Sequence, residues 1–259
     1  MSILSDFKLS ISNHHLWRTL AWYDILGRYR RSTLGPLWIT ISMAVTVGAM
    51  GPLYGSLFNF DPSDFIPHLA LGLIFWAMFS TCINESAYTF AESAHYMKQS
   101  YVPAPVFVLR IIYRQLIVFL HNFALYPIIM LLLWKPITLD ILWFFPAFLL
   151  VVANLFFITL LVSIFCGRYR DMAQMLISIM SLLFFITPII WRMEQLPEER
   201  RALVDWNIFA TYLDLVRKPL LGLTPDVHQW ITGLISLAVL AVFSLFVYAK
   251  TKNRITYWL

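Results

Sequence analysis

Long apolar stretches without a charged side chain constrain this sequence more than any other feature. One extends from Pro36 to Phe58, and another covers residues 141–166. A helix needs roughly 20 such residues to cross the hydrocarbon layer of a membrane. Hydrophobic residues make up 60% of the 259-residue chain and charged residues only 13%, well below the usual charged share of a soluble domain. The sequence therefore predicts an all-α integral membrane protein.

Six segments qualify as membrane spans, and the third is less regular than the others. Its clearest part is residues 115–134, and we expect this helix to begin earlier, after Pro105. The six expected transmembrane helices are residues 36–58, 66–90, 107–134, 141–166, 172–191 and 229–249. An even number of spans places both termini on one side of the membrane. We expect residues 1–259 to form a single transmembrane domain.

Lysine and arginine residues indicate the orientation, because they accumulate in cytoplasmic loops. The segments on the side of the termini are strongly basic and include Lys8, Arg18, Arg28, Arg30, Arg31, Arg168, Arg170, Lys250, Lys252 and Arg254. The opposite loops contain more acids than bases, with Asp61, Asp64, Asp140, Glu194, Glu198, Glu199, Asp205, Asp214 and Asp226. We therefore expect both termini to be cytoplasmic. The net charge of +5 is an orientation signal and does not indicate nucleic-acid binding.

Two segments lie outside the six spans. Within residues 1–33, the stretch His14–Ser32 has apolar residues in two stripes at helical spacing. Two stripes predict an amphipathic interface helix that contacts the membrane on one side and protein on the other; a plain interfacial anchor is the alternative. Residues 192–228 are long for an outer loop and rich in apolar residues. They predict two short re-entrant helices, separated near Asn207, that form an outer gate.

Ionisable residues at the ends of spans two and three are functional candidates, because charges inside a membrane are costly. Glu85 and Glu92 lie near the inner end of span two, and Arg110 and Arg114 lie one helical turn apart near the inner start of span three. If the two spans are antiparallel, Glu85 pairs with Arg114 and Glu92 with Arg110. These residues form either a hydrated polar entry zone or ion pairs that hold the two helices together.

Other polar and aromatic residues in the spans give weaker signals. Asn154 is most simply an interhelical hydrogen-bonding group. Aromatic residues make up 17% of the chain, and many tryptophans lie where spans meet water, as in an aromatic belt. Deeper aromatic residues either face lipid or form a surface on which sugar rings stack; these are Tyr54, Phe58, Phe75, Trp76 and Phe79.

Sequence patterns for catalysis, nucleotide binding and metal binding are missing. The chain has no Walker A, HExxH or GxSxG sequence, and Cys82 and Cys166 lie far apart in apolar runs. A membrane-embedded enzyme is therefore disfavoured. A proton-coupled carrier is also disfavoured, because Glu85 and Glu92 lie toward the inner end of their span. The remaining interpretation is a passive conduit that another protein drives.

Several motifs are distributed along the chain: RYRRSTLGPLW at 28–38, RYRDM at 168–172, TPIIW at 187–191 and RITYWL at 254–259. Together they resemble the permease subunits of ABC-2 type transporters that export O-antigen, capsule or teichoic-acid polymers. The stretch that begins at Asn207 is similar to the NP segment of that family, with Ile208 in place of the proline. The resemblance covers essentially the whole chain.

The resemblance implies a homodimer in the bacterial inner membrane, with one copy of a separate cytoplasmic ATPase docked on each subunit. ATP and Mg²⁺ would bind to that ATPase, and this chain would hold no cofactor or metal. The implied substrate is a polysaccharide on an undecaprenyl diphosphate lipid, which passes through a channel between the subunits. An ABC-2 pump for a small drug or a free lipid is the alternative, although such pumps often carry a larger outer domain.

The resemblance also assigns roles to three groups of residues. Residues of the interface helix would meet the lipid diphosphate, with each basic charge worth about 1 kcal/mol near an anionic surface: Arg18, Arg28, Tyr29, Arg30 and Arg31. Two segments would receive the ATPase motion: the loop around Ser93–Val106 and the turn after span four. The loop has Tyr101-Val102-Pro103 where the family has phenylalanine before proline. The residues concerned are Glu92, Lys98, Tyr101, Pro103, Arg168, Arg170 and Asp171. The candidates for lining the channel are Tyr54, Phe58, Trp76, Phe79, Asn84, Glu85, Arg114, Asn154 and Trp191.

Overall fold

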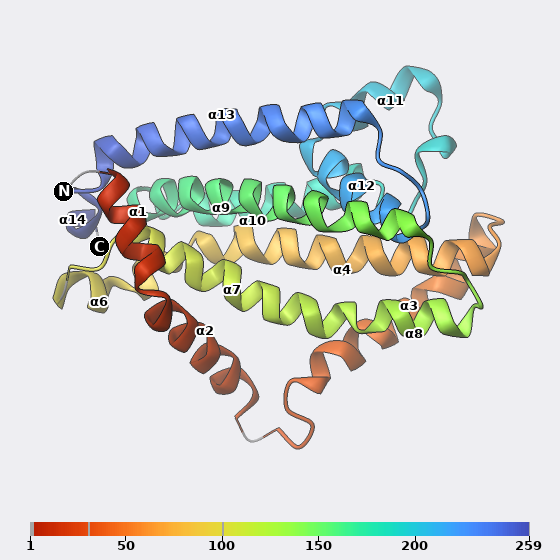
Figure 1. Ribbon diagram of the computed structural model, residues 1–259, viewed down its shortest axis with the longest axis horizontal. Coiled ribbons are helices and arrows are strands. Elements are labelled where there is room, and N and C mark those ends of the chain that lie inside the picture. The colour runs from red at the N-terminus through yellow and green to blue at the C-terminus, as the bar shows by residue number, and fades with distance from the viewer. Residues whose placement is uncertain (1–2, 31, 100, 259) are drawn as a thin grey trace.

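The computed structural model describes residues 3–30, 32–99 and 101–258, and its regular elements there are all helices, as predicted. The first half contains α1 (Ile3–Ser12), α2 (His14–Tyr29), α3 (Leu37–Leu57), α4 (Pro62–Ser86), α5 (Thr89–Glu92), α6 (Ala94–Gln99), α7 (Ala104–Phe123) and α8 (Leu125–Leu132). The second half contains η1 (Leu139–Trp143), α9 (Phe144–Arg168), α10 (Met172–Ile186), η2 (Met193–Gln195), α11 (Glu198–Asp205), α12 (Ile208–Leu220), α13 (Val227–Thr251) and α14 (Ile255–Trp258). Both termini lie at one end of the bundle, and α11 lies at the other (Figure 1).

Within the described residues, five helical segments are long and apolar enough to cross a membrane: Leu37–Leu57, Pro62–Ser86, Ala104–Leu132, Leu139–Arg168 and Val227–Thr251. The expected fifth of the six spans, residues 172–191, contains only the 15-residue helix α10. At 1.5 Å per residue, α10 is about 22 Å long, which is shorter than a hydrocarbon layer of about 30 Å. It ends because Thr187 precedes Pro188 and adopts an extended backbone with ψ 135°.

Two other helices differ in their limits from the expected spans. α4 begins at Pro62, where the Asp61 side chain accepts a hydrogen bond from the Ser63 N–H at 2.8 Å, and it ends at Ser86 instead of residue 90. The third span is interrupted at Ala124 between α7 and α8. Pro127 accounts for this interruption, because its ring clashes with the carbonyl group four residues earlier and it has no N–H to donate.

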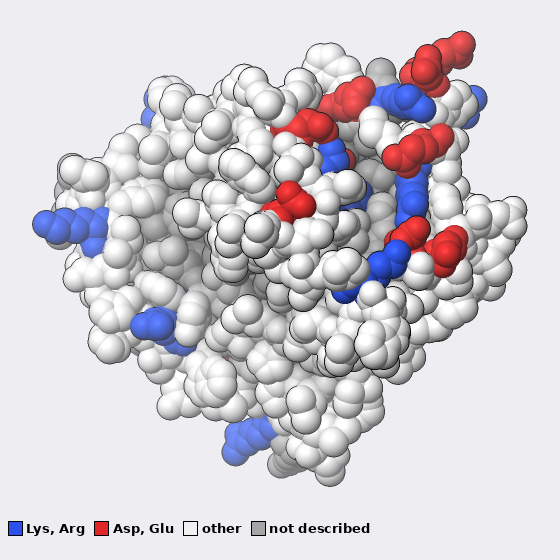
Figure 2. All heavy atoms as spheres, turned by 45° about the vertical axis from the view of Figure 1, so that its right-hand side comes forward, with Lys and Arg blue, Asp and Glu red and all other residues white. Residues whose placement is uncertain are grey.

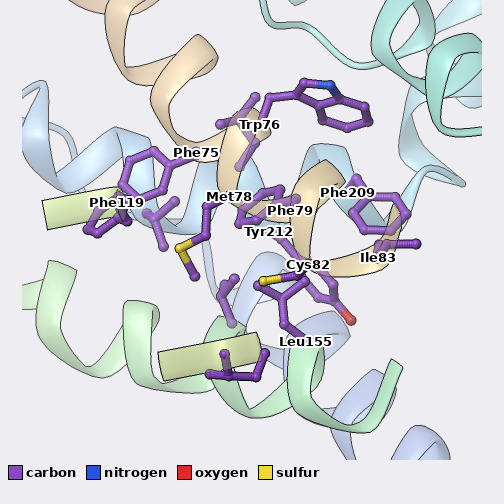
Figure 3. Close-up of a cluster of buried hydrophobic side chains, with 14 of the residues drawn as sticks. Phe75, Trp76, Met78, Phe79, Cys82, Ile83, Phe119, Leu155, Phe209 and Tyr212 are labelled. Atoms are coloured by element: carbon purple, nitrogen blue, oxygen red, sulfur yellow. The ribbon is translucent and has the colours of Figure 1, made fainter. Parts of the chain in front are cut away.

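The core surrounds α4. Phe75 and Phe79 are fully buried, and the ring centroids of Phe75 and Phe119 of α7 are 5.2 Å apart. Figure 3 shows these side chains together with Phe209 and Tyr212 of α12. α3 and α13, in contrast, expose most of their apolar residues, so their outer faces are available to lipid or to another protein chain.

The segment between α10 and α13 forms two helices, α11 and α12, that separate at Asn207 near the expected position. The Asn207 side chain caps α12 by accepting from the Phe209 N–H at 3.0 Å, and its amide donates to Thr187 at 2.8 Å. α12 packs among α4, α9 and α13 with Tyr212 fully buried. Gly72 of α4 permits the close approach of the segment after α10, because a Cβ there would lie 2.8 Å from the Ile189 carbonyl oxygen.

The N-terminal segment forms two helices rather than one, with a turn at Asn13. α2 packs on α7 and buries Ala21 and Ile25, and in Figure 1 it slants away from the bundle toward the start of α3. Apolar residues of the two predicted stripes face away from the bundle: Trp22 is 49% exposed and Tyr23 is 65% exposed. α2 therefore presents an apolar surface outward, as an amphipathic helix at an interface does.

Candidate functional site

A network of ion pairs joins α2 to α4 and α7 near the end of the bundle that contains the termini. Asp24 of α2 accepts hydrogen bonds from Arg110 at 2.8 and 2.5 Å and from Arg114 at 2.5 Å. Arg114 also donates to Glu85 of α4 at 2.6 Å, and Arg28 of α2 donates to the same carboxylate at 3.2 Å. Each carboxylate thus accepts from two guanidinium groups.

Exposure and charge are unevenly distributed within this network. The side chains of Arg110 and Arg114 are 16% and 12% exposed, whereas that of Arg28 is 54% exposed. Three guanidinium groups face two carboxylates, which leaves one positive charge in excess. Because Arg28 is the most exposed member, we expect the excess charge to be accessible to an anionic group there.

The predicted pairing of spans two and three is half correct. The contact between Glu85 and Arg114 is confirmed, which favours the ion-paired interpretation for these two residues. The pairing of Glu92 with Arg110 is wrong, because Arg110 binds Asp24 and Glu92 lies exposed on α5, beyond the end of α4. Sequence reasoning missed Asp24, although it is the only acid in His14–Ser32 and two arginines one turn apart on α7 needed a carboxylate partner.

The residues predicted to meet a lipid diphosphate do not form a single cluster. Arg28 and Arg30 are exposed near the C-terminal end of α2, and Tyr29 between them is half-buried. Arg18 lies ten residues earlier, about 15 Å along the helix, with its guanidinium carbon 5.5 Å from the Tyr113 ring centroid. Arg31 lies outside the described residues. Among the described members of this group, Arg28 and Arg30 are the exposed basic residues at the end of α2.

A second polar centre surrounds Asp6 of α1, which is fully buried. Its carboxylate accepts hydrogen bonds from the Tyr101 hydroxyl at 2.8 Å, the Lys252 ammonium at 3.0 Å and the Tyr248 hydroxyl at 3.2 Å. Tyr101 belongs to the segment before α7, whereas Lys252 and Tyr248 lie at the end of α13. Asp6 therefore connects three parts of the chain that are distant in sequence.

Charge and burial act in opposite directions on the Asp6 carboxyl group. Burial favours the neutral acid, but the hydrogen bonds from Lys252 and Tyr101 and the charge of Lys252 outweigh it and hold the pKa of Asp6 below its ordinary value. Burial and the neighbouring carboxylate raise the pKa of Tyr101 to about 12. At neutral pH the pair is therefore an ionised aspartate and a neutral tyrosine that donates to it.

The other residues predicted to receive the motion of an ATPase lie near this end of the bundle. Lys98 is exposed on α6, and Pro103 is buried at the start of α7. The guanidinium carbon of Arg168 lies 5.2 Å from the Tyr169 ring centroid and 5.4 Å from that of Trp258 in α14. Arg170 and Asp171 are exposed in the turn between α9 and α10.

Some of the predicted channel-lining residues border a groove between α4 and α10. Trp76 and Asn84 of α4 line it, together with Ser181 and Phe184 of α10. The groove has a volume of about 260 Å³, and the Trp76 and Phe184 ring centroids are 5.9 Å apart. An aromatic wall with hydroxyl and amide groups matches the surface that a sugar ring contacts.

Further predicted channel residues lie apart from this groove. Tyr54 stacks on Phe58 in α3 with ring centroids 5.8 Å apart, and Trp191 donates to the Phe185 carbonyl oxygen at 3.1 Å. Phe79 and Asn154 are fully buried in the core, so a channel role does not fit their positions. Asn154 accepts from Tyr212 at 2.8 Å, which confirms the interhelical hydrogen bond.

The chain matches known proteins over most of its length. A family model described as ABC-2 type transporter matches residues 15–221, a range that includes the whole ion-pair network but not Asp6. The chain is also similar to two proteins of Klebsiella pneumoniae named "O-antigen export system permease protein RfbA". The identities are 22% over 239 residues and 23% over 242 residues, and both alignments cover 89% of this chain and 90% of the relative.

Proposed function

The chain belongs to the ABC-2 type transporter family, and we propose that it is the permease subunit of an exporter for a lipid-linked polysaccharide such as O-antigen. The similarity to two O-antigen export permeases over nearly the full length of both chains carries this proposal. A separate ATPase supplies the energy, because the chain has no Walker A sequence with which to bind ATP phosphates.

In this proposal the chain crosses the bacterial inner membrane six times and both termini are cytoplasmic. The crossing that the long helices do not supply consists of the 15-residue helix α10 and residues 187–191, which follow it. The excess of basic residues at the end that contains the termini supports this orientation. The segment between α10 and α13 then lies at the outer face, where α11 and α12 act as a re-entrant gate.

The lipid diphosphate of the substrate meets the protein at the end of α2. Arg28 and Arg30 supply accessible positive charge, and the ion pair with Glu85 fixes the position of Arg28 relative to α4. The exposed side chains of Trp22 and Leu26 suit the boundary between lipid headgroups and acyl chains. The substrate thus enters from the inner leaflet beside α2.

Each protomer docks one ATPase on the surface formed by α5, α6, Tyr101 and the turn at residues 169–171. Two copies of the chain form the channel, and the groove that contains Trp76 and Asn84 belongs to its wall. The exposed apolar faces of α3 and α13 leave surface for dimer contacts and for lipid. A channel suits a long polymer, because such a substrate does not fit in an enclosed site.

Deletion of the gene in its native cell tests the function. We expect the polysaccharide to accumulate in the cytoplasm on its lipid carrier and to disappear from the cell surface. Immunoblotting of surface glycan and mass spectrometry of the lipid-linked pool measure the two effects. Re-expression of the wild-type chain is the control for polar effects on neighbouring genes. Unchanged surface glycan in the deletion strain would refute the proposal.

A further inference from the structure

A cavity whose wall contains several charged side chains lies at the end of the molecule opposite the termini. It has a volume of about 520 Å³ and is enclosed by the start of α4, the residues after α8, the segment after α10 and the C-terminal half of α12. This volume falls within the range of about 300–1,000 Å³ that small-molecule pockets occupy. Figure 2 looks onto this side and shows acidic and basic side chains interspersed there, whereas most of the remaining visible surface is uncharged.

Opposite charges alternate along the cavity wall. Asp64 accepts from Lys135 at 2.5 Å, and Asp214 accepts from Arg217 at 2.6 Å. Arg217 is only 5% exposed and also donates to the Pro188 carbonyl oxygen at 2.7 Å. These pairs hold donors and acceptors in fixed positions.

Arg192 has hydrogen-bonding capacity that the described residues leave unused. Its Nη2 donates to the Asp64 carbonyl oxygen at 3.0 Å, and its guanidinium carbon lies 4.6 Å from the Phe60 ring centroid. The Nε–H of Arg192 is buried and finds no acceptor among the described residues. Of the N–H donors of this guanidinium group, only Nη2 has an acceptor among the described residues, so the group retains donors for a ligand in the cavity that Arg192 lines.

The charge balance of the wall selects the class of ligand. The carboxylates are Asp64, Glu194 and Asp214, and the basic groups are Lys135, Arg192, Arg217 and Lys218. A phosphate group in this cavity would approach three carboxylates, and a metal cation would approach four basic groups. A neutral ligand with many hydroxyl groups avoids both conflicts, because each hydroxyl both donates and accepts a hydrogen bond.

We propose that this cavity is a carbohydrate-binding site that accommodates a short run of neutral sugar rings. The hydroxyl groups would bridge neighbouring acids and bases, and one would accept a hydrogen bond from the guanidinium group of Arg192, which lines the cavity. The identity of the natural ligand, the polysaccharide that emerges at the outer face, rests on the proposed function. Binding of a neutral sugar depends only on the cavity. A site at this position would hold the emerging polymer and oppose its return.

Ligand-observed NMR on the purified chain in detergent tests the site without an ATPase or transport. The probes are the neutral trisaccharides maltotriose, mannotriose and galactotriose, and saturation-transfer difference spectra report their binding. We expect at least one probe to bind saturably. The substitution Arg192→Met should raise its Kd about tenfold, a loss of about 1.4 kcal/mol. Glu194→Gln changes an exposed wall residue with little risk to folding, and it should also raise the Kd.

Arg200→Met is the matched control, because Arg200 is an exposed arginine of the same outer segment that does not line the cavity. The site is refuted if none of the three sugars binds, or if Arg200→Met weakens binding as much as both cavity variants do. If inorganic phosphate displaces the sugar at constant ionic strength, the ligand is an anion, and the assignment of a neutral carbohydrate is overturned. If the sugar binds but deletion of the gene leaves surface glycan unchanged, the carbohydrate site is supported and the proposed export function is refuted.

Discussion

Arg114 is the residue of the ion-pair network that contacts both carboxylates, Asp24 of α2 and Glu85 of α4. It contacts Asp24 at 2.5 Å and Glu85 at 2.6 Å, and no other member of the network joins both carboxylates. Its side chain is 12% exposed. Removing one partner of a buried ion pair is destabilising, because the remaining charge is buried and water cannot take the place of the lost partner.

We expect Arg114→Gln to lower the free energy of unfolding by about 1–3 kcal/mol, the cost of leaving buried charged groups with one partner fewer. Thermal unfolding in detergent measures the effect. Arg170→Gln on the exposed turn between α9 and α10 is the control and should change stability by less than about 0.5 kcal/mol. The combined exchange Glu85→Arg with Arg114→Glu should recover only part of the loss, because the carboxylate introduced on α7 would face Asp24. Full recovery would contradict the contact with Asp24.

Asp6 provides a second prediction at the residue scale. Asp6→Asn should release α1 from Tyr101 and the end of α13, because the amide cannot pair with the Lys252 charge. Hydrogen exchange followed by mass spectrometry should show faster exchange in α1. Tyr101→Phe removes one hydrogen bond to the same carboxylate and should have a smaller effect. If hydrogen exchange in α1 is equal in the wild type and in Asp6→Asn, Asp6 does not hold α1 against Tyr101 and the end of α13.

The pH dependence of this attachment has a definite sign. The pKa of Asp6 is lowered in the folded protein from an ordinary value of 3.8. The carboxylate therefore stabilises the fold fully above that ordinary value, and its contribution is lost as the pH falls through the lower folded pKa. The protection of α1 amides against hydrogen exchange should therefore not change between pH 5 and 8 on account of Asp6. In Asp6→Asn, the loss of protection at acidic pH should disappear.

The helices of this protein were predictable from the sequence where neighbouring residues alone determine where a helix begins and ends. The apolar runs that form α3, α9 and α13 are visible in the sequence because hydropathy depends only on neighbouring residues. The end of α10 at Thr187 and the break at Ala124 also have local causes, in Pro188 and Pro127, but an apolar run hides them. The burial of α12 was not predictable, because it depends on helices distant in sequence.

The start of α12 allows a prediction at the scale of the element. Ile208 occupies the first position of the helix, where proline is well tolerated, and Asn207 before it has the extended backbone that precedes proline readily. Ile208→Pro should therefore change the free energy of unfolding by less than about 1 kcal/mol. Asn207→Ala should cost about 1–2 kcal/mol, because the cap to Phe209 is lost together with the bond to Thr187.

Thermal unfolding compares these variants under one condition. Ala210→Pro is the control for proline itself, because the Ala210 N–H donates the first hydrogen bond of the helix to the Asn207 carbonyl oxygen at 2.9 Å. This substitution should cost about 1–3 kcal/mol, because that hydrogen bond is lost. If Ile208→Pro is as damaging as Ala210→Pro, the helix does not begin at Ile208.

Two polar centres at one end of the molecule connect its outermost helices to its core. The network around Arg114 attaches α2 to α4 and α7, and Asp6 attaches α1 to the start of α7 and the end of α13. The sequence predicted the contact between Glu85 and Arg114, because both lie near the turn that joins consecutive spans. It did not predict Asp24 or Asp6, because their partners lie more than 80 residues away.

The whole molecule must both bind its substrate and keep its assembled form. Substitutions at Arg28 and Arg30 should affect the first of these properties without affecting the second. We expect Arg28→Gln with Arg30→Gln to remove about 2 kcal/mol of attraction for an anionic headgroup, since each charge is worth about 1 kcal/mol. Export of the proposed polysaccharide should then fall by about 30-fold. Lys250→Gln with Arg254→Gln removes the same charge from exposed residues at and just after the end of α13, and serves as the control for orientation and net charge.

Surface glycan measures export, and light scattering of the purified protein measures its oligomeric state. The oligomeric state should not change in either double variant. Glu85→Gln alone removes the carboxylate partner of Arg28 but keeps its charge, so it should reduce export less than the double variant does. If Glu85→Gln stops export completely, the ion-pair network is responsible rather than the accessible charge. If assembly fails together with export, the two arginines serve folding and orientation, and the lipid diphosphate binds elsewhere.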